Sequence, residues 1–519
     1  MGIEMNRRSF VTATAATAAL AATGAACANA DEAAKPAQSE VVETIDCDIV
    51  VCGLGAAGFM SAITAAKAGS KVVVLEKGED ITAPNGVYVS GPFAVGTTVL
   101  QEKEGGTTLT EDDVFYHVLN YTHWTPNPAL MRRCIHESKN AVANLLEVGY
   151  EFKEANFRFE TPFIGEKGGF HLITTPLEDR FTVWSDAIAN YGIDARFSTP
   201  MTSLVMDGDK VCGVLAEGPD GTVQVNAGAV IIATGGYLGN EDLQERFLHT
   251  RDLNVAKGGV SLCTGDGILA CEAVGAALEK TFGYCPCEYG GTNDKASRPA
   301  KQDKYDQNYA FKFGYYGNLL VDAEGKRFLN EGMLCDFPMS YGSEQTLHNN
   351  PWYAIVDQTY VDALTTEGLY NYMKARGAQD GEYGDPNTNW FIGAYFKDRI
   401  LDKLPEDIEE GIAEGWCWKA DTLEEVAEMA GRPVETGPFY ITQNYQSAWS
   451  TFGGVRIDDQ CRVLTAADYT PIPGLYCVGT EAGSLYYSPY YDIPGYCYGL
   501  CIDSGYIAAT EAVAYTQGA

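Results

Sequence analysis

Short runs of apolar, often β-branched residues that end close to a glycine or an acidic residue dominate the hydrophobic pattern of the chain. Such runs occupy residues 47–52, 71–75, 230–233 and 474–478, and each has the length and composition of a buried strand. The alanine-rich stretch 59–68 lies between the first two runs and predicts a helix. Strands that alternate with helices are typical of a parallel sheet, so the pattern predicts an α/β fold.

The loop after the first run has the spacing of a dinucleotide-binding turn, Gly53-x-Gly55-x-x-Gly58. Gly53 allows a tight turn, Gly55 lets the backbone approach a pyrophosphate, and Gly58 permits close packing of the helix on the strand. The helix N-terminus then faces the phosphates, and Glu76, about 20 residues on, can accept a hydrogen bond from a ribose hydroxyl. The cofactor-binding residues predicted from this unit are Gly53, Gly55, Ala57, Gly58, Glu76 and Lys77.

Three later segments favour FAD over NAD as the cofactor. Residues 230–236, 264–267 and 474–481 are strand ends or turns rich in glycine, where the backbone could approach a large ligand. Each segment alone could be an ordinary turn, but together they fit a cofactor that spans much of the domain. The residues that we expect to contact FAD from these segments are Thr234, Gly235, Gly236, Asp266, Gly479 and Glu481.

Composition excludes several other classes of protein. Apolar residues make up 46% and charged residues 20% of the 519 residues, which excludes a disordered chain and a protein with several membrane spans. The formal net charge is -34 and no run of Lys and Arg occurs. We therefore expect no nucleic-acid partner, because phosphate binding needs a basic surface.

Residues 1–30 predict a twin-arginine export signal. Arg7 and Arg8 precede an alanine-rich apolar stretch, and residues 28–30 fit a small-x-small cleavage site. The apolar stretch is too weak for a membrane anchor, so we do not expect an integral membrane protein. Lipid attachment at Cys27 stays open as an alternative. We expect an exported protein on the extracytoplasmic face, in the periplasm or the cell envelope, with residues 31–45 as a linker.

Taken together, these motifs resemble the fumarate reductase and succinate dehydrogenase flavoprotein family. The similarity extends over nearly all of residues 46–515. It includes residues 325–331, which are similar to the family's G-x-R-F-x-N-E segment, and residues 451–455, which are similar to its T-x-G-G-V segment. The resemblance implies substrate binding at the flavin, beneath a cap. The domains that it implies are a split, Rossmann-like FAD-binding domain at 46–283 and 446–519 and an inserted α+β cap domain at 284–445.

The chain departs from this family at the positions that hold a dicarboxylate. Cys285 stands in the register of the family's His-Pro-Thr segment, Ser450 replaces the histidine before T-x-G-G, and Cys335 falls at or near the proton-donating arginine. A dicarboxylate without cationic partners would leave desolvated anions unpaired, at a cost of several kcal/mol each. We therefore do not expect fumarate or succinate as the substrate.

The C-terminal segment is similar instead to that of 3-ketosteroid dehydrogenases and related gut-bacterial enone reductases. It contains Tyr491-x-x-x-Gly495. In those enzymes a tyrosine hydroxyl and a glycine N–H polarise the ketone next to the reacting C–C bond, which implies these roles for Tyr491 and Gly495. Tyr341 and Cys335 are the candidate proton donors, because phenols and thiols are protonated at neutral pH. The sequence thus predicts an exported FAD-dependent reductase of activated C=C bonds in an enone or enoate.

Six tyrosines crowd this segment, and two interpretations stay open for them. They can pack as an aromatic core, or they can line a neutral, hydrogen-bonding pocket for an aromatic, polyphenolic or steroid-like substrate. They are Tyr486, Tyr487, Tyr490, Tyr491, Tyr496 and Tyr498.

We expect electrons to come from a separate donor, a cytochrome or a quinol-linked protein. The sequence has no C-x-x-C-H haem motif and no standard ferredoxin spacing. Alternative functions are a 3-ketosteroid-type dehydrogenase that introduces a C=C bond, a fumarate reductase-like respiratory enzyme, and a binding subunit with structural FAD. No metal site is expected, and an iron–sulfur centre on Cys285, Cys287 and Cys335 would have a nonstandard spacing.

Overall fold

The computed structural model describes most of the chain after the predicted signal. It describes residues 40–101, 109–155, 169–249, 256–257, 262–291, 310–315, 318–329, 331, 346, 349, 351–375, 400–422, 438–487, 493 and 495–518. The chain divides into a unit that ends at Val41 and a unit from Val42 to Ala519, and the second is described below. The predicted signal 1–30 lies outside the described residues. The first strand begins at Val41, earlier than the expected Cys47.

The first sheet is mixed and has eight strands among the described residues. The strands are β1 (Val41–Cys52), β2 (Val72–Leu75), β5 (Asp194–Arg196), β6 (Met201–Asp207), β7 (Lys210–Gly218), β8 (Gly221–Ile232), β15 (Arg462–Leu464) and β16 (Pro471–Cys477). The order is β15-β16-β8-β1-β2-β5, and the pairs β16–β8, β1–β2 and β2–β5 are parallel. The last four residues of β1, Ile49–Cys52, and all of β2 are buried without alternation, as expected for strands covered on both faces. The predicted α/β fold is therefore confirmed.

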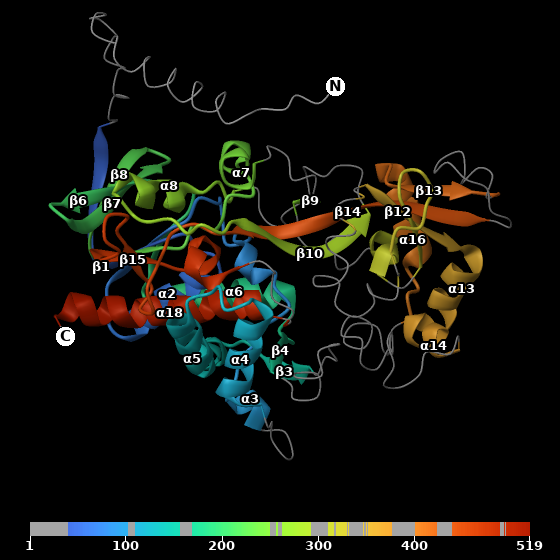
Figure 1. Cartoon of the computed structure of the whole chain (residues 1–519), viewed down its shortest axis with the longest axis horizontal. Coiled ribbons are helices and arrows are strands. Elements are labelled where there is room, and N and C mark those ends of the chain that lie inside the picture. Colours follow the sequence, from blue (N-terminus) through green and yellow to red (C-terminus); the bar gives the residue numbers. More distant parts are fainter. Residues whose placement is uncertain are drawn as a thin grey trace, which may run out of the picture. The chain divides into compact units, whose positions relative to one another are not determined.

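Two helices lie side by side against this sheet (Figure 1). They are α2 (Ala56–Lys67) and the C-terminal helix α18 (Tyr496–Gln517). Gly505 of α18 has no side chain, and a Cβ at that position would overlap the carbonyl oxygen of Ala57. The missing side chain lets the two backbones approach, and this brings the C-terminal helix next to the predicted dinucleotide turn.

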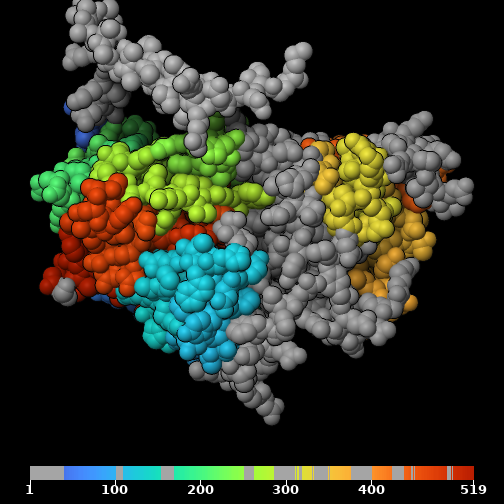
Figure 2. Space-filling model, in the orientation of Figure 1, coloured from blue at the N-terminus to red at the C-terminus, as the bar shows by residue number. Residues whose placement is uncertain are grey.

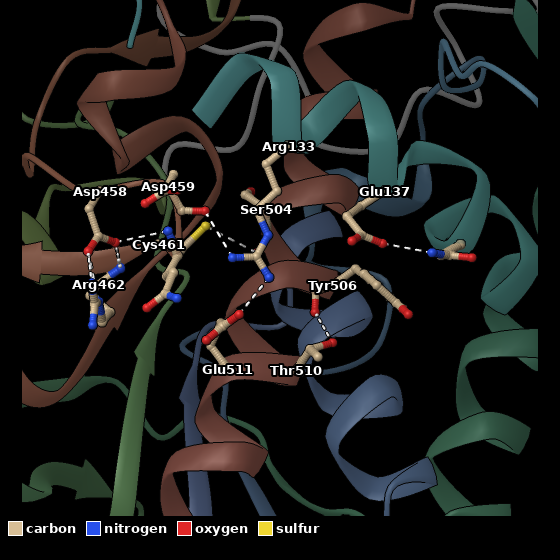
Figure 3. Close-up of polar contacts among 12 residues, drawn as sticks. Arg133, Glu137, Asp458, Asp459, Cys461, Arg462, Ser504, Tyr506, Thr510 and Glu511 are labelled. Atoms are coloured by element: carbon tan, nitrogen blue, oxygen red, sulfur yellow. Dashed lines mark hydrogen bonds and ion pairs between the residues drawn. The ribbon is translucent and has the colours of Figure 1, made fainter. Parts of the chain in front are cut away.

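A third helix, α5 (Pro128–Glu147), is joined to α18 by a partly buried ion pair. Arg133 of α5 donates to the Glu511 carboxylate at 2.5 Å and to the Asp459 carbonyl at 3.4 Å (Figure 3). The Cys461 thiol lies in the same turn and donates to the Ser504 carbonyl at 3.6 Å. These contacts join α5, α18 and the turn before β15, so that the C-terminal helix is held from two sides.

The second sheet has six strands among the described residues. They are β9 (Ala256–Lys257), β10 (Gly283–Gly291), β11 (Leu319–Val321), β12 (Trp352–Asp357), β13 (Cys417–Ala420) and β14 (Phe439–Phe452). Every pairing except β9–β14 is antiparallel, as expected for a cap separate from the parallel sheet. β14 runs without a break past the predicted domain boundary at 445 and extends toward the first sheet (Figure 1). The domain boundaries remain predictions.

The remaining described elements surround these two sheets. They are the hairpin β3 (Phe152–Ala155) and β4 (Phe170–Ile173), the helices α3 (Thr98–Gln101), α4 (Glu111–Tyr121), α6 (Leu177–Asn190), α7 (Glu241–Leu248), α8 (Asp266–Ala273), α13 (Gln358–Thr366), α14 (Gly368–Ala375) and α16 (Leu404–Glu414), and the 3-10 turns η1 (Asn85–Val87), η2 (Ala310–Tyr315), η3 (Gly479–Glu481) and η4 (Gly483–Leu485). The surface of α4 and α5 appears in cyan in Figure 2. None of the described helices combines the length and the apolar character needed to cross a bilayer.

Candidate active site

The turn between β1 and α2 has the shape of a phosphate cradle. Gly53 has a φ of 101°, and a Cβ there would overlap the Ala233 carbonyl oxygen. A Cβ at Gly58 would overlap the Gly53 carbonyl oxygen in the same way. At Gly55, by contrast, no atom lies within 4 Å of the Cβ position, and no side chain caps the helix that begins there. The turn therefore combines open space at Gly55 with uncapped N–H groups at the start of α2, and a pyrophosphate needs both.

Glu76 follows β2, as predicted, and its carboxylate also shapes the turn. One carboxylate oxygen accepts from the Leu54 amide and the other from the Gly78 amide, both at 2.7 Å. The side chain is buried. Each carboxylate oxygen has a second lone pair, so Glu76 can hold the loop and still accept a hydrogen bond from a ribose hydroxyl.

Glu481 and the Thr234–Gly235 turn meet at the carboxyl ends of β8 and β16. The Thr234 hydroxyl donates to the Glu481 carboxylate at 2.7 Å, and the Gly235 amide donates to it at 3.0 Å. Burial raises the pKa of Glu481 to about 8, although these two hydrogen bonds oppose the shift. Gly236 lies against β14, where a Cβ would overlap the Thr451 hydroxyl. The structure thus brings four predicted residues, Thr234, Gly235, Gly236 and Glu481, into one largely buried cluster at the carboxyl ends of β8 and β16.

Lys77 and Asp266 form a second, more exposed cluster at the N-terminus of α8. The Lys77 ammonium lies 3.0 Å from the Asp266 carboxylate and 2.6 Å from the Thr264 hydroxyl. About 30% of each charged side chain is exposed, so the pair is partly screened by water. This cluster links the chain just after Glu76 to the Thr-Gly-Asp-Gly segment.

Gly479 connects the late turn to the C-terminal helix. Its φ is 72°, and its amide donates to the Ser504 hydroxyl at 3.1 Å. A Cβ at Gly479 would lie 3.2 Å from the Ala57 Cβ and 4.0 Å from the Cys501 Sγ. Gly479 and Ala57, both predicted to contact FAD, therefore lie in contact with each other. Ser504 and Cys501 of α18 lie at the same turn, but no spacing in the sequence of this helix marks them as site residues.

Gly495 begins α18, with a φ of 73° and no side chain that caps the helix. Its carbonyl oxygen accepts from the Phe93 amide at 3.0 Å and from the Gly499 amide at 2.8 Å. The N–H groups at this helix N-terminus form a cluster of partial positive charge. A developing negative charge on a substrate oxygen would be stabilised there, which is the role predicted for the Gly495 N–H.

Cys285 and Ser450, the residues that replace the family's histidine positions, are register partners in β10 and β14. Cys285 is fully buried, and the Ser450 hydroxyl donates to the Thr480 hydroxyl at 3.0 Å. The two departures from the family pattern thus lie opposite each other. A neutral thiol and a neutral hydroxyl occupy a place where the resemblance implied cationic or ionisable rings.

Four of the six clustered tyrosines are described, and all four are buried. The Tyr486 hydroxyl donates to the Cys497 carbonyl at 3.1 Å and lies 3.2 Å from the Cys501 sulfur. Burial raises the pKa of this phenol well above its ordinary value, so it is neutral. The four described residues are Tyr486, Tyr487, Tyr496 and Tyr498. Their burial favours the core-packing interpretation for them and leaves both interpretations open for Tyr490 and Tyr491.

Three of the four candidate catalytic residues, Tyr491, Tyr341 and Cys335, lie outside the described residues. Their roles remain predictions. Among the residues that the structure does describe, no group of three or more His, Cys, Asp or Glu side chains could hold a metal ion. Since Cys335 lies outside that set, the iron–sulfur hypothesis is not tested.

Comparison with known proteins agrees with the flavin cradle. A family model described as "FAD binding domain" matches residues 48–496. The chain is 28% identical, over 515 residues, to a vinyl phenol reductase of Lactiplantibacillus plantarum, and the alignment covers 91% of this chain and 97% of that protein. The match extends through both sheets, so the two proteins are similar over nearly their whole length.

Two solved structures have the same fold. The open conformation of a flavocytochrome c3 fumarate reductase matches with a TM-score of 0.66 at 17% identity, over 99% of this chain and 82% of the other. A 3-ketosteroid delta1-dehydrogenase from Sterolibacterium denitrificans, in complex with 1,4-androstadiene-3,17-dione, matches with a TM-score of 0.62 at 16% identity, over 90% of this chain and 99% of the other. At these identities the likeness concerns the fold.

Proposed function

This chain belongs to the FAD binding domain family and is an FAD-dependent oxidoreductase, and from this premise we propose that it reduces the activated C=C bond of an enone or related alkene. We propose an aromatic or steroid-like body for the substrate. The observation that carries the proposal is the neutral pair Cys285 and Ser450, which offers no cation to a dicarboxylate. The similarity to a vinyl phenol reductase supports it, because that protein's name describes reduction of a phenolic alkene.

The residues of the chain fit FAD, and different parts of the site would hold different parts of the cofactor. The open turn at Gly55 and the N-terminus of α2 would hold the pyrophosphate, and Glu76 would accept from the ribose. The buried cluster around Glu481 and Thr234 would hold the part of FAD that lies at the end of β8. When bound, FAD supplies the hydride for the reduction.

The protein's own contribution to the reaction is to orient the substrate and to stabilise charge. In our proposal the Gly495 N–H and the Tyr491 hydroxyl donate hydrogen bonds to the carbonyl oxygen next to the alkene. Such donors strengthen as negative charge develops on that oxygen, and removal of one typically costs a factor of about 100 to 1,000 in rate. Tyr341 or Cys335 would give a proton to the carbon next to the carbonyl.

We also propose that the electrons come from a separate protein, a cytochrome or a quinol-linked donor. The acidic composition of the chain suits a basic donor. Export through the signal at residues 1–30 is part of the same proposal, because an exported enzyme has little access to nicotinamide cofactors. The Arg7-Arg8 pair supports it, and fractionation of cells that express the full chain and an Arg7→Lys, Arg8→Lys variant tests it.

The reaction is tested by anaerobic reduction of the purified, FAD-loaded protein with dithionite, followed by a panel of acceptors. We expect an enone or a vinyl phenol to restore the oxidised flavin spectrum and fumarate to leave it unchanged. Reoxidation by fumarate alone would overturn the proposal. Reoxidation by no acceptor would favour a binding subunit, and reduction of the oxidised protein by a saturated ketosteroid would favour the dehydrogenase.

A substitution at Tyr491 tests the carbonyl-binding role. We expect Tyr491→Phe to lower kcat by about two to three orders of magnitude while FAD stays bound, because one hydrogen-bond donor to the developing charge is lost. Tyr515→Phe, near the exposed end of α18, is the matched control and should leave kcat unchanged. Full activity of Tyr491→Phe would remove this residue from the mechanism.

A further inference from the structure

Three glycines meet around the N-terminus of α18, and none has room for a side chain. A Cβ at Gly495 would lie 2.6 Å from the Gly91 carbonyl oxygen and 2.6 Å from the Phe170 ring. A Cβ at Gly91 would overlap the carbonyl oxygen of His171, and one at Gly169 would overlap a neighbouring aromatic ring. The helix start, the loop that contains Gly91 and strand β4 are therefore in backbone contact, and Figure 1 shows β4 near the end of α18 that is remote from the C-terminus.

Two hydrogen bonds connect these backbones in series. The Phe93 amide donates to the Gly495 carbonyl at 3.0 Å. The next residue, Ala94, donates its amide to the Gly169 carbonyl at 2.9 Å. A displacement of the Gly169 carbonyl would therefore move the Phe93–Ala94 segment, and with it the start of α18.

The Gly169 carbonyl has a second donor, the side chain of His171. The His171 Nδ1 lies 2.9 Å from this oxygen, and the Nε2 lies 2.6 Å from the Thr97 hydroxyl. Burial lowers the pKa of His171 to about 4, so the ring is neutral at pH 7 and carries one N–H. A carbonyl can only accept, so the hydrogen must be on Nδ1, and Nε2 accepts from Thr97.

The surroundings of His171 make a packing role alone a poor explanation. β4 has the sequence Phe-His-Leu-Ile, and all four residues are buried. His171 is fully buried, and an apolar side chain there would avoid the cost of desolvating two ring nitrogens. The imidazole is tolerated because both nitrogens are hydrogen-bonded, and one of those bonds ends on the carbonyl that supports the helix start.

We propose that His171 is a positioning residue, which holds the backbone N–H of Gly495 in place through the Gly169 carbonyl and the Phe93–Ala94 segment. The inference rests on the proposed function, because it concerns the donor that Gly495 would present to the substrate carbonyl. Geometry makes this position sensitive: a donor must lie about 2.7–3.1 Å from the developing oxyanion, and a misplacement of about 1 Å can cost about a hundredfold in rate.

Two amide substitutions separate the two hydrogen bonds of the ring. His171→Asn can place an amide N–H where Nδ1 was and keep the bond to Gly169, whereas His171→Gln reaches the Nε2 position and keeps only the contact with Thr97. We expect His171→Asn to retain kcat within about threefold and His171→Gln to lower kcat by about 10- to 100-fold with little change in the substrate KM. The visible spectrum of the bound FAD should be the same in both variants.

Hydrogen–deuterium exchange of the FAD-free protein gives a readout that does not depend on activity. The Phe93 amide should exchange faster in His171→Gln than in His171→Asn, because its acceptor at Gly495 is no longer held. Thr97→Val is the control, since it removes the contact at Nε2, together with the longer bond that the Leu100 amide donates to the Thr97 hydroxyl at 3.4 Å. It should behave like His171→Asn. If His171→Gln does not fold, a kcat of His171→Asn more than about tenfold below that of Thr97→Val would overturn the proposal, because both variants keep the bond to Gly169.

Equal kcat values and equal Phe93 exchange in the two His171 variants would overturn the proposal, as would a loss of kcat in Thr97→Val as large as in His171→Gln. Failure of the proposed function has a different signature. In that case Tyr491→Phe keeps full activity, while the exchange experiment still reports whether His171 fixes the start of α18.

Discussion

Glu481 combines complete burial with two short hydrogen bonds, and the two effects act on its charge in opposite directions. Burial raises its pKa to about 8 from 4.5, and the bonds from Thr234 and Gly235 reduce the shift. In the FAD-free protein this carboxyl therefore keeps its proton at pH 7. A neutral acid in this place adds no negative charge to the part of the site that FAD would enter at the end of β8.

The raised pKa of Glu481 predicts a pH dependence of stability. The folded protein holds this proton up to about pH 8, whereas the unfolded chain releases it near pH 4.5, so the stability contributed by the group is greatest below pH 4.5 and is lost as the pH rises to about 8. We expect Glu481→Gln to reduce the fall in the free energy of unfolding between pH 5 and pH 8, measured by urea denaturation of the FAD-free protein. Glu272→Gln, a half-exposed partner of Arg246, is the control. An unchanged slope in Glu481→Gln would contradict the assignment.

At the scale of elements, the turn between β1 and α2 and the helix α18 together form the cofactor side of the site. The turn was predictable because its signal is local: the glycine spacing and two flanking strands lie within 30 residues. The part that α18 takes in the site was not predictable, because it depends on contacts between segments far apart in the sequence. Ser504 of α18 binds the Gly479 amide, and His171 of β4 binds the Gly169 carbonyl that supports the helix start. A serine in an apolar helix and a histidine in a four-residue strand have no pattern around them, so only the tertiary contacts show what they do.

Gly55→Ala tests whether the open space in the turn belongs to FAD. Its φ of -64° suits alanine and no atom lies within 4 Å of the new Cβ, so the free energy of unfolding of the FAD-free protein should change by less than about 1 kcal/mol. FAD affinity should fall by about tenfold or more, because the methyl group occupies the approach of the pyrophosphate. Isothermal titration with FAD checks this. Gly53→Ala, which overlaps Ala233, should instead lose both stability and FAD binding.

Ser504→Ala tests the contact between α18 and the late turn. The substitution leaves the buried Gly479 amide without an acceptor, which should cost about 1–3 kcal/mol of stability and weaken FAD binding. Thr510→Ala on the same helix removes a similar hydroxyl contact at an exposed position, and should change stability by less than about 0.5 kcal/mol. Thermal unfolding with and without FAD measures both effects. Equal effects of the two substitutions would show that the Gly479 contact is unimportant.

At the scale of the whole molecule, the net charge of -34 is the dominant electrostatic property. From this charge we predict how the rate at which a basic partner protein reduces the bound FAD depends on salt. A basic cytochrome donor should reduce the bound FAD more slowly when ionic strength rises from about 0.01 M to about 0.15 M, because screening removes the long-range attraction. Dithionite, an anion, should not show this decline. Stopped-flow measurements compare the two donors, and a rate with the basic donor that is independent of salt would exclude electrostatic steering.

The fold class and the cofactor could be predicted from the sequence, because glycine-rich turns follow apolar runs at several places along the chain. The path of β14 could not, because its 14 residues look like two elements divided at the predicted boundary of 445. Its cap half pairs with β12, and its last residues bond to Thr480 and Tyr237 beside the flavin cradle. Pairing with partners at both ends keeps the strand continuous.

Because β14 is continuous, it connects the antiparallel sheet directly to the turns beside the flavin cradle. The strand has no break at residue 445, since Tyr445 is the register partner of Gly290 in β10 and Asn444 that of Trp352 in β12. At the other end of the strand, Ser450 and Thr451 are hydrogen-bonded to the turns that contain Thr480 and Tyr237. We therefore expect a change in the tilt of the antiparallel sheet to reach the turns at Thr480 and Tyr237, beside the place that FAD would occupy.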